Sequence, residues 1–469
     1  MSAQAEFESR LASVLSRYIP DCQELVSVER LSGGASQETY RIKIASSDGE
    51  RLLAMRRAPG GETVEPTPGH PGLAAEALLM RAAKANGVPE PEVFHILEPA
   101  DELGDGFIME WLEGVALGAR VVRSEELDDI RPQLAYLCGE ILGRIHAIDL
   151  GATGLDSKLD VISPEDYVEQ TWLRYREFDT AAPMIDYAGR WLMDHLPDGF
   201  TPALVHNDFR NGNIMFDAQG VVAVLDWEVA HIGDPYRDLG WICTNSWRFG
   251  RSDLPVGGFG SYEDLFAGYE SVTGEPVDRE RVKFWEVFGS FWWAIGCLGM
   301  AEHYRTGPDK TVERPAIGRR SSECQVDCVN LLIPGAVNLV EAQNHDNELD
   351  MPRISELLES VRNFLHGDVM EATHGRNNFL SRVAGNSLDI VLRDQALGGK
   401  GRALELERLQ SILGPGNLTQ LRWKLVHGLR DGSIDLDNVS VQNHLRDTVV
   451  NQVAIDQPKY SGFKNSLEN

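Results

Sequence analysis

Three polar side chains at one end of a short hairpin carry the chemistry that this sequence indicates. The stretch from Leu204 to Trp241 begins with a short apolar strand, and the loop that contains His206 and Asp208 follows it directly. Asn213 comes five positions after Asp208, and two strand-like runs joined by a glycine-containing turn separate Asn213 from Asp226. This hairpin would bring Asp208, Asn213 and Asp226 to the same end of a small sheet.

These residue types at this spacing suit phosphoryl transfer. Asp208 can accept or orient a hydroxyl group, while the side-chain oxygens of Asn213 and Asp226 are hard ligands of the kind that Mg²⁺ prefers. The spacing His-x-Asp-x-x-x-x-Asn, with an Asp at the end of the next strand, matches the catalytic loop of kinases. An Asx-rich turn capped by Asp226 would explain any one of these residues but not the ordered set.

The same stretch resembles the aminoglycoside phosphotransferase (choline/aminoglycoside kinase-like) family. The matching residues are His206, Asp208, Asn213 and Asp226, followed by Gly233-Asp234-Pro235 and Asp238-Leu239, with Trp227-Glu228 where protein kinases have Phe-Gly. The resemblance implies an α+β, two-lobed protein-kinase-like fold that uses ATP and Mg²⁺. It also implies that Asp208 and His206 are the catalytic residues, His206 as a brace of the loop, and that Asn213 and Asp226 bind the metal.

The N-terminal part contains a loop that would cover the nucleotide phosphates. Gly33, Gly34 and Ser36 lie in a Gly/Ser-rich segment between two strand-like runs. Glycine allows the backbone to approach an anion closely and to point its N–H groups at it. Most Gly-Gly turns are plain hairpins, so the position of this loop ahead of the catalytic hairpin is what favours a nucleotide site.

Two further residues would complete that site. Arg56 stands where the resembled kinases have a phosphate-binding lysine, and arginine binds phosphate in bidentate fashion. Glu76, in the first turns of the next helix, is expected to pair with Arg56 as in the kinase Lys–Glu pair, or else to complement the helix dipole. The strand near residues 107–111 resembles the hinge of the family, which places the adenine against backbone groups near Glu110 and Leu112.

Apolar residues at helical spacing predict helices over about 130–148, 164–176 and 183–195 and a helical region from 262 to 306. Arg174 and the aromatic residues of these segments are candidates for the acceptor site, but core packing is the default for each aromatic residue. The aromatic residues are Tyr167, Trp172, Tyr175, Trp285, Phe288, Phe291, Trp292 and Trp293. Asp234 and Asp238 are expected to cap and brace the catalytic loop.

The last part of the chain carries no kinase motif. We expect a helix ending near Gln343, a polar break, a long helical region over 402–430 and a loosely ordered tail from 456. This part resembles the uncharacterised helical domain found C-terminal to some bacterial members of the family, for which a role in homodimer formation or substrate selection is a hypothesis. The predicted domains are an N-lobe (1–112), a C-lobe (113–345) and an additional all-α domain (346–469).

The composition excludes several classes of partner. The formal net charge of -28 argues against binding to nucleic acid or to an anionic membrane surface. The six cysteines suit a reducing cytoplasm, and Cys324 and Cys328 are expected to pack in the core of a helix. The N-terminus lacks the apolar core of a signal peptide, and the uncharged stretch 287–301 is short for a membrane span. These features predict a cytoplasmic protein without a membrane partner.

The resulting hypothesis is an ATP-dependent kinase that phosphorylates a hydroxyl of a small molecule. The segments LSGGASQETYRI and VLDWEVAHIGDPYRDLGW look most like the kinase domains fused to acyl-CoA dehydrogenases, which implies a hydroxyacyl-CoA acceptor, while the acidic charge would suit a cationic aminoglycoside-like compound. A nucleotide-binding pseudokinase that acts through the C-terminal helices stays open because of Arg56. A metal-dependent hydrolase using His206, Asp208 and Asp226 is a third interpretation. It is disfavoured because a hydrolase would not need two lobes joined by a hinge.

Overall fold

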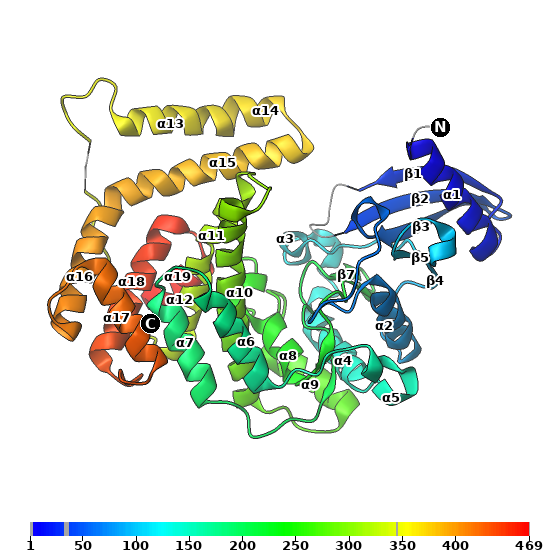
Figure 1. Ribbon diagram of the computed structural model, residues 1–469, viewed down its shortest axis with the longest axis horizontal. Helices are drawn as coiled ribbons and strands as arrows, with labels where there is room; N and C mark the ends of the chain where they lie inside the picture. The colour runs from blue at the N-terminus through cyan, green and yellow to red at the C-terminus, as the bar shows by residue number, and fades with distance from the viewer. Residues whose placement is uncertain (1–2, 32–36, 344–345, 469) are drawn as a thin grey trace.

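The computed structural model describes residues 3–31, 37–343 and 346–468. The chain forms an N-terminal lobe built on a sheet, a larger lobe built mostly of helices, and a group of C-terminal helices (Figure 1). The N-terminal lobe lies at the right of Figure 1, and the C-terminal helices lie at the left and the top, beyond the large lobe. This arrangement confirms the predicted α+β class with two lobes and additional C-terminal helices.

Five antiparallel strands form the sheet of the N-terminal lobe, in the order β1-β2-β3-β5-β4. They are β1 (Glu24–Arg30), β2 (Glu38–Ser46), β3 (Gly49–Arg57), β4 (Val93–Ile96) and β5 (Gly106–Glu110), and the lobe adds the helices α1 (Ala3–Tyr18) and α2 (Leu73–Ala85). Successive side chains of a strand point to opposite faces. On β3, Leu53 belongs to the same buried cluster as Leu11 of α1, whereas Ala54 belongs to the cluster that contains Leu79 of α2. The strand that ends in Arg56 and Arg57 is therefore packed from both faces.

The large lobe surrounds two small antiparallel sheets with helices. Strand β6 (Ala203–Val205) pairs with β9 (His231–Gly233), and β7 (Ile214–Asp217) pairs with β8 (Gly220–Val224). The helices are α3 (Gly118–Val121), α4 (Leu134–His146), α5 (Leu150–Thr153), α6 (Pro164–Arg176), α7 (Pro183–Asp194), α8 (Tyr236–Cys243), α9 (Tyr262–Thr273), α10 (Arg279–Thr306), α11 (Glu313–Arg319) and α12 (Ser321–Leu332). The predicted helices before the hairpin are confirmed within a few residues, and the predicted helical region after it consists of α9 and α10.

Helices α4 and α9 approach each other closely because glycines face each other at their crossing. A Cβ atom on Gly139 would lie 2.1 Å from the backbone oxygen of Leu265, and one on Gly268 would lie 2.0 Å from that of Tyr136. No larger residue fits at either position without separating the helices. Their packing supports α4, whose residue His146 contacts Asp238 of α8.

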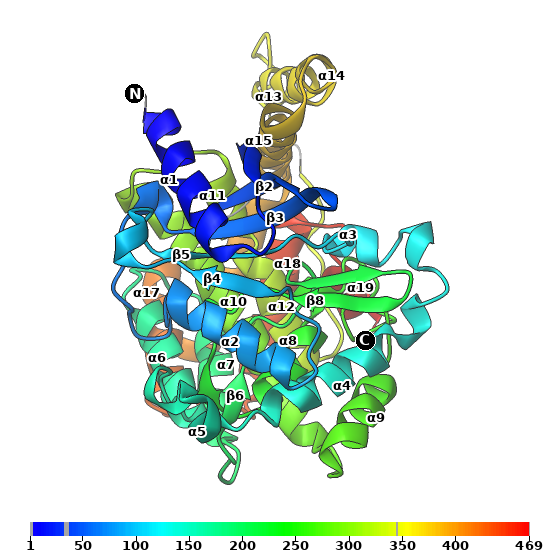
Figure 2. The same cartoon turned by 90° about the vertical axis from the view of Figure 1, so that its right-hand side faces the viewer.

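The C-terminal helices divide into a projecting arm of three helices and a packed group. They are α13 (Ile354–Phe364), α14 (Met370–Ala372), α15 (Gly375–Arg393), α16 (Gly399–Leu413), α17 (Leu418–Arg430), α18 (Val439–Asp456) and α19 (Ser461–Glu468), with π-helical turns at Leu365–Val369 and Asp394–Gly398. Residues of α16 to α18 share one buried cluster with α6, α7, α10 and α12 of the large lobe, whereas α13 to α15 extend from the body as an arm (Figures 1 and 2).

Two expectations about this region are wrong, and the predicted helical region over 402–430 is present but divided. The helix expected to end near Gln343 ends at Leu332, directly before Ile333 and Pro334, because proline cannot continue the helical hydrogen bonding. The long helical region over 402–430 is two helices, because Gly414-Pro415-Gly416 interrupts it and Gly414 has a φ of +87°. The tail is helix α19 and not a loosely ordered end, since the Tyr460 hydroxyl donates to Asp327 Oδ2 (2.6 Å) and Asn330 Nδ2 donates to Gly462 O (2.8 Å).

Across residues 3–31, 37–343 and 346–468, no helix is both long and apolar enough to span a bilayer.

Candidate active site

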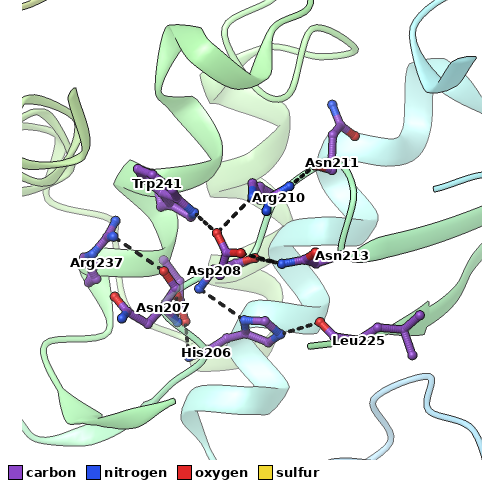
Figure 3. A network of polar contacts seen from close by, with 10 residues as sticks. His206, Asn207, Asp208, Arg210, Asn211, Asn213, Leu225, Arg237 and Trp241 are labelled. Carbon is purple, nitrogen blue, oxygen red and sulfur yellow. Dashed lines mark hydrogen bonds and ion pairs between the residues drawn. The ribbon is translucent and has the colours of Figure 1, made fainter. Parts of the chain in front are cut away.

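The catalytic loop connects β6 of one small sheet to β7 of the other. His206 follows the last residue of β6, Asn213 precedes β7, and Asp226 lies just beyond β8. Leu225 N donates to Asn213 O (2.7 Å), so the two ends of the hairpin that carry Asn213 and Asp226 are joined by a backbone hydrogen bond. The loop thus brings Asp208 and Asn213 into contact, as Figure 3 shows, and the hydrogen bond made by Leu225 places the neighbouring Asp226 beside Asn213.

Three donors hold the carboxylate of Asp208. Arg210 Nε (2.9 Å) and Trp241 Nε1 (2.8 Å) donate to its Oδ1, and Asn213 Nδ2 (2.6 Å) donates to its Oδ2. Figure 3 shows these side chains converging on Asp208 from the loop, from α8 and from the start of β7. The side chain of Asp208 keeps 19% of its surface exposed. Its orientation is therefore set by the protein while an edge remains accessible to a reacting hydroxyl.

His206 braces the loop from beneath. The residue is fully buried, its Nε2 lies 3.1 Å from Leu225 O, and Asp208 N donates to its Nδ1 (3.2 Å). Because Nδ1 accepts, Nε2 carries the proton and donates to the carbonyl. Burial lowers the pKa of His206, which keeps the ring neutral in this tautomer. The contacts agree with a bracing role, and His206 touches the backbone of Asp208, not its carboxylate.

Asp238 holds the other side of the loop. Its Oδ2 accepts from His206 N (2.8 Å), its Oδ1 accepts from Asn207 N (2.7 Å), and His146 Nε2 lies 3.2 Å from Oδ2. Burial opposes the charge, but hydrogen bonding and the charge of His146 outweigh it and lower the pKa of Asp238. Asp238 does not cap α8, so the bracing role is present and the capping role is not.

Asp234 acts in a similar way at the turn before α8. Its Oδ1 accepts from Tyr236 N (3.1 Å), and its Oδ2 accepts from Arg281 Nε (2.8 Å) and Trp285 Nε1 (2.7 Å). The buried carboxylate therefore ties the turn to α10 and supports the helix that carries Trp241.

Two residues of the site have a left-handed backbone. Asn207 has a φ of +68° and Asp226 a φ of +71°. Such values cost free energy for residues other than glycine, and Asn and Asp tolerate them best. At Asp226 this conformation turns the chain sharply after β8. Both strained residues thus belong to the predicted site: Asn207 lies in the catalytic loop, and Asp226 is a predicted metal ligand.

Arg56 connects the N-terminal lobe to this hairpin. Its Nη1 lies 2.6 Å from Glu76 Oε1, its Nη2 lies 2.9 Å from Asp226 Oδ1, and its Nε donates to Gln37 Oε1 (2.8 Å). The expected Arg56–Glu76 ion pair is thus present. Burial works against the charge of Arg56, but Glu76 and Asp226 outweigh it and raise the pKa of Arg56. Burial raises the pKa of Glu76 to about 7, against the opposing effect of Arg56.

The donor set fits a magnesium ion held jointly with phosphate. Within the described ranges no group of three or more His, Cys, Asp and Glu side chains gathers in the way an all-protein metal site would need. Mg²⁺ is commonly held by one or two protein oxygens plus the phosphates of its nucleotide. Asn213 and Asp226 offer that kind of partial site, and the side chain of Asp226 is 33% exposed.

The remaining predicted nucleotide contacts are only partly visible. Gly33, Gly34 and Ser36 lie outside the described residues. Glu110 ends β5, and its N–H already donates to Glu92 O (2.8 Å), so its carbonyl and the backbone of Leu112 are the groups left for an adenine edge. A cavity of about 240 Å³ lies beside Gln37, Glu76 and Glu228. The nucleotide roles of these residues stay predictions.

Most aromatic and cysteine residues considered from the sequence belong to the core. Tyr167, Trp172, Tyr175, Trp285, Phe288 and Phe291 are buried, Trp292 and Trp293 pack against the same cluster, and Cys324 and Cys328 are buried thiols. The sequence interpretation missed Gln37, Arg210 and Trp241. For Arg210, proximity to Asp208 is a weak signal. For Trp241, 33 positions away, no local signal exists, because only the packing of α8 places it beside Asp208.

Comparisons with known proteins agree with this geometry. A model of the phosphotransferase enzyme family matches residues 27–274, and a model of a domain of unknown function matches residues 371–460. The chain is 31% identical over 326 residues to acyl-CoA dehydrogenase family member 10 of Mus musculus, which covers 65% of this chain and 29% of that protein. It is 26% identical over 477 residues to acyl-CoA dehydrogenase family member 11 of Homo sapiens, which covers 92% of this chain and 57% of that protein. The chain therefore spans less than two thirds of the length of these relatives.

Among solved structures, a candidate aminoglycoside phosphotransferase from Ralstonia eutropha JMP134 is similar to this chain. The TM-score is 0.55 at 22% identity, and the match covers 68% of this chain and 95% of that chain. This likeness, together with the family match, confirms the predicted kinase-like fold of the two lobes.

Proposed function

The chain belongs to the phosphotransferase enzyme family, and from this premise we propose that it is an ATP-dependent kinase that phosphorylates a hydroxyl group of a small molecule. The observation that carries the proposal is the carboxylate of Asp208, which three donors orient and which stays partly exposed beside Asn213. A carboxylate in this state suits the binding of a hydroxyl that is about to attack phosphorus.

The residues divide the work as follows. Asp208 accepts a hydrogen bond from the acceptor hydroxyl and directs its oxygen toward the γ-phosphorus. The new oxygen–phosphorus bond forms as the bond to the bridging oxygen of the leaving ADP breaks, and the hydroxyl proton passes to Asp208. Asn213 and Asp226 would hold Mg²⁺, which supplies charge neutralisation for the phosphates. Arg56, oriented by Glu76, binds the phosphates from the N-terminal lobe. Catalysis then consists mainly of positioning and electrostatic stabilisation.

Two acceptor classes follow from the relatives. The matches to acyl-CoA dehydrogenase family members favour a hydroxyacyl-CoA, and the likeness to a candidate aminoglycoside phosphotransferase favours a polyhydroxylated amine. A cytoplasmic location, no nucleic-acid or membrane partner, and assembly as a homodimer remain predictions of the same proposal.

A pseudokinase is the second candidate, because Arg56 replaces the usual lysine. Two contacts speak for the active kinase instead. Arg56 keeps the ion pair with Glu76, and Trp241 Nε1 donates to Asp208 Oδ1 and orients that carboxylate.

Magnesium-dependent ATP hydrolysis in the wild type and in Asp208→Asn tests the proposal. We expect the substitution to lower turnover by about 10²- to 10⁴-fold, the usual contribution of a positioned acid–base group. Asp217→Asn is the matched control, since this residue of the same hairpin only accepts backbone N–H bonds from Gln219 and Gly220 in the turn. Equal turnover of Asp208→Asn and wild type would exclude the proposed mechanism, and ATP binding without turnover under any acceptor would favour the pseudokinase.

A further inference from the structure

A large cavity lies where the C-terminal helices meet the large lobe. Its volume is about 810 Å³, which falls in the range of small-molecule sites, and such sites occur preferentially between domains. One side is lined by residues that follow α3 and α8, by α11 and by the start of α12, and the other by α15 and the residues from the end of α18 to the start of α19. The cavity therefore needs both parts of the chain, including the part that matches the domain of unknown function.

The catalytic loop is attached to a wall of this cavity. Asn245 and Ser246 line the cavity, and Trp247 follows them directly. The guanidinium of Arg210 lies over the Trp247 ring at 4.3 Å, and Asn211 Nδ2 donates to Trp247 O (3.1 Å). Arg210 also donates to the carboxylate of Asp208. A molecule bound in the cavity would therefore contact the segment 245–246, which directly precedes the Trp247 that supports Arg210.

The four carboxylates that line the cavity are all neutralised. Arg376 pairs with Glu313 (2.7 Å) and Arg362 with Asp389 (2.9 Å), both from outside the lining. Within the lining, Arg320 pairs with Glu323 (3.1 Å) and Arg319 with Asp456 (3.3 Å). These four ion pairs leave no carboxylate of the wall unmatched.

Three further cations of the lining have no carboxylate within ion-pair distance among the described residues: Arg123, Arg393 and Lys459. Arg123 Nη2 donates to Phe249 O (3.0 Å), and Arg393 donates to the backbone oxygens of Ile455 (2.5 Å) and Asp456 (3.2 Å), so both guanidinium groups are held at the wall by carbonyls. In a chain with a formal net charge of -28, this cavity carries surplus positive charge.

We infer that this cavity binds part of the phosphoryl acceptor, and that the acceptor is a hydroxyl compound with an anionic group, held by Lys459, Arg393 and Arg123. The inference rests on the proposed kinase function and deepens it by assigning the C-terminal helices to the acceptor site. Cations without a carboxylate at ion-pair distance attract phosphate or carboxylate groups and repel a polycationic aminoglycoside. Between the two acceptor classes above, the charge of the cavity therefore selects the anionic one.

Calorimetric titration of the full chain with 3-hydroxybutyryl-coenzyme A, and separately with kanamycin, tests this inference. We expect the anionic probe to bind more tightly than the cationic one and to weaken as salt rises. Lys459→Glu should raise the Kd of the anionic probe by about tenfold or more, since loss of one charge-assisted contact is worth at least that factor. Lys464→Glu is the matched control, because this lysine is exposed on α19 and does not line the cavity.

The outcomes separate this inference from the kinase proposal. Arg393→Gln, which removes a second cation of the wall, should weaken the anionic probe in the same direction as Lys459→Glu. Equal affinity for the two probes, absence of binding by the anionic probe, or equal effects of Lys459→Glu and Lys464→Glu would overturn the inference. Wild-type ATP hydrolysis that depends on Asp208, measured in the same preparation, decides the proposed function independently of these titrations.

Discussion

The guanidinium of Arg56 joins the two lobes, because its Nη2 lies 2.9 Å from Asp226 Oδ1 while its Nη1 lies 2.6 Å from Glu76 Oε1. One side chain of β3 thus contacts helix α2 of its own lobe and the metal-ligand candidate of the other lobe. In the proposed reaction Asp226 would hold magnesium and Arg56 would bind phosphate. Without nucleotide and metal, Arg56 and Asp226 therefore neutralise each other. With both bound, the phosphates would neutralise Arg56 and the magnesium ion would neutralise Asp226.

Asp226→Asn tests the metal role. The amide keeps the shape of the side chain but removes the charge that would attract Mg²⁺, so we expect turnover to fall by about 10²-fold or more and the magnesium dependence to shift to higher concentration. A titration of ATP hydrolysis against Mg²⁺ measures both effects. Thermal melting verifies that the variant is folded, and wild-type turnover at the wild-type magnesium midpoint would argue against the assignment.

Arg56→Lys tests whether arginine here binds phosphate. A lysine can keep the ion pair with Glu76, but a single ammonium group cannot also reach Gln37 and Asp226 as the planar guanidinium does. We expect the KM for ATP to rise roughly 3- to 10-fold and to rise further in Arg56→Met. Arg51→Lys, on the same strand, is the control, since Arg51 stacks on Phe94. Unchanged nucleotide affinity in Arg56→Met would remove Arg56 from the site.

The buried carboxyl of Glu76 predicts a specific pH dependence of stability. Its pKa rises from 4.5 to about 7 in the folded chain, so between these values the folded state binds more protons than the unfolded state. The stabilisation is complete below pH 4.5 and is lost as the pH rises through 7, which amounts to about 3 kcal/mol. Glu76→Gln, which cannot ionise, should not show this loss.

Urea unfolding of wild type and Glu76→Gln at several pH values between 4.5 and 8 measures this difference. Glu29→Gln, at an exposed position of β1, serves as the control and should follow the wild type. Identical pH profiles for wild type and Glu76→Gln would show that Glu76 does not titrate in this range.

A buried ion pair links the C-terminal helices to the large lobe. Arg430 Nε lies 2.6 Å from Asp186 Oδ1, and Trp172 Nε1 (2.9 Å) and the Tyr175 hydroxyl (3.1 Å) also donate to this carboxylate. Because the Asp186 side chain is fully buried, Arg430→Met leaves a buried charge without its cation and should cost about 3 to 5 kcal/mol in urea unfolding.

Arg305→Met is the control for that measurement. Arg305 is 72% exposed and pairs with Glu302 at 3.6 Å. Such surface ion pairs contribute less than about 1 kcal/mol to the free energy of unfolding. If both variants lose the same small amount, the C-terminal helices do not depend on this contact. A single unfolding transition that shifts as a whole would show that the helices and the large lobe unfold together.

The arm formed by α13 to α15 is the surface at which we expect a second copy of the chain. Ile354, Leu357, Val361 and Phe364 repeat along α13 at helical spacing, and each is at least 50% exposed. Residues 353–393 contain five arginines and five carboxylates and are therefore neutral, whereas the whole chain has a net charge of -28. Two copies can approach along a neutral apolar arm with less electrostatic repulsion than elsewhere.

Sedimentation velocity measures this association directly. The double variant Leu357→Glu/Val361→Glu should convert the dimer to a monomer, whereas Leu173→Glu, at a 48% exposed leucine of α6, should leave the dimer intact. A wild-type chain that remains monomeric at every concentration tested would contradict the prediction.

The sequence by itself determined the elements whose causes are local. Asp208, Asn213 and Asp226 fall within one loop and hairpin, and short-range turn and strand preferences suffice to bring their ends together. The helices α6 and α7 follow from apolar periodicity and begin with Pro164 and Pro183, residues that favour the first turn. The Arg56–Glu76 pair was accessible through resemblance, because the kinase-like order of strand and helix brings the two residues together.

Only the tertiary structure decided the contacts that join distant segments. Trp241 reaches Asp208 because α8 packs against the catalytic loop, and Arg430 reaches Asp186 across 244 positions because α17 packs on α7. The tail looked unstructured since α19 is short and polar, and it is helical because Tyr460 finds a buried carboxylate at Asp327. Local preferences do not encode such contacts, since their free energy arises only when packing removes both partners from water.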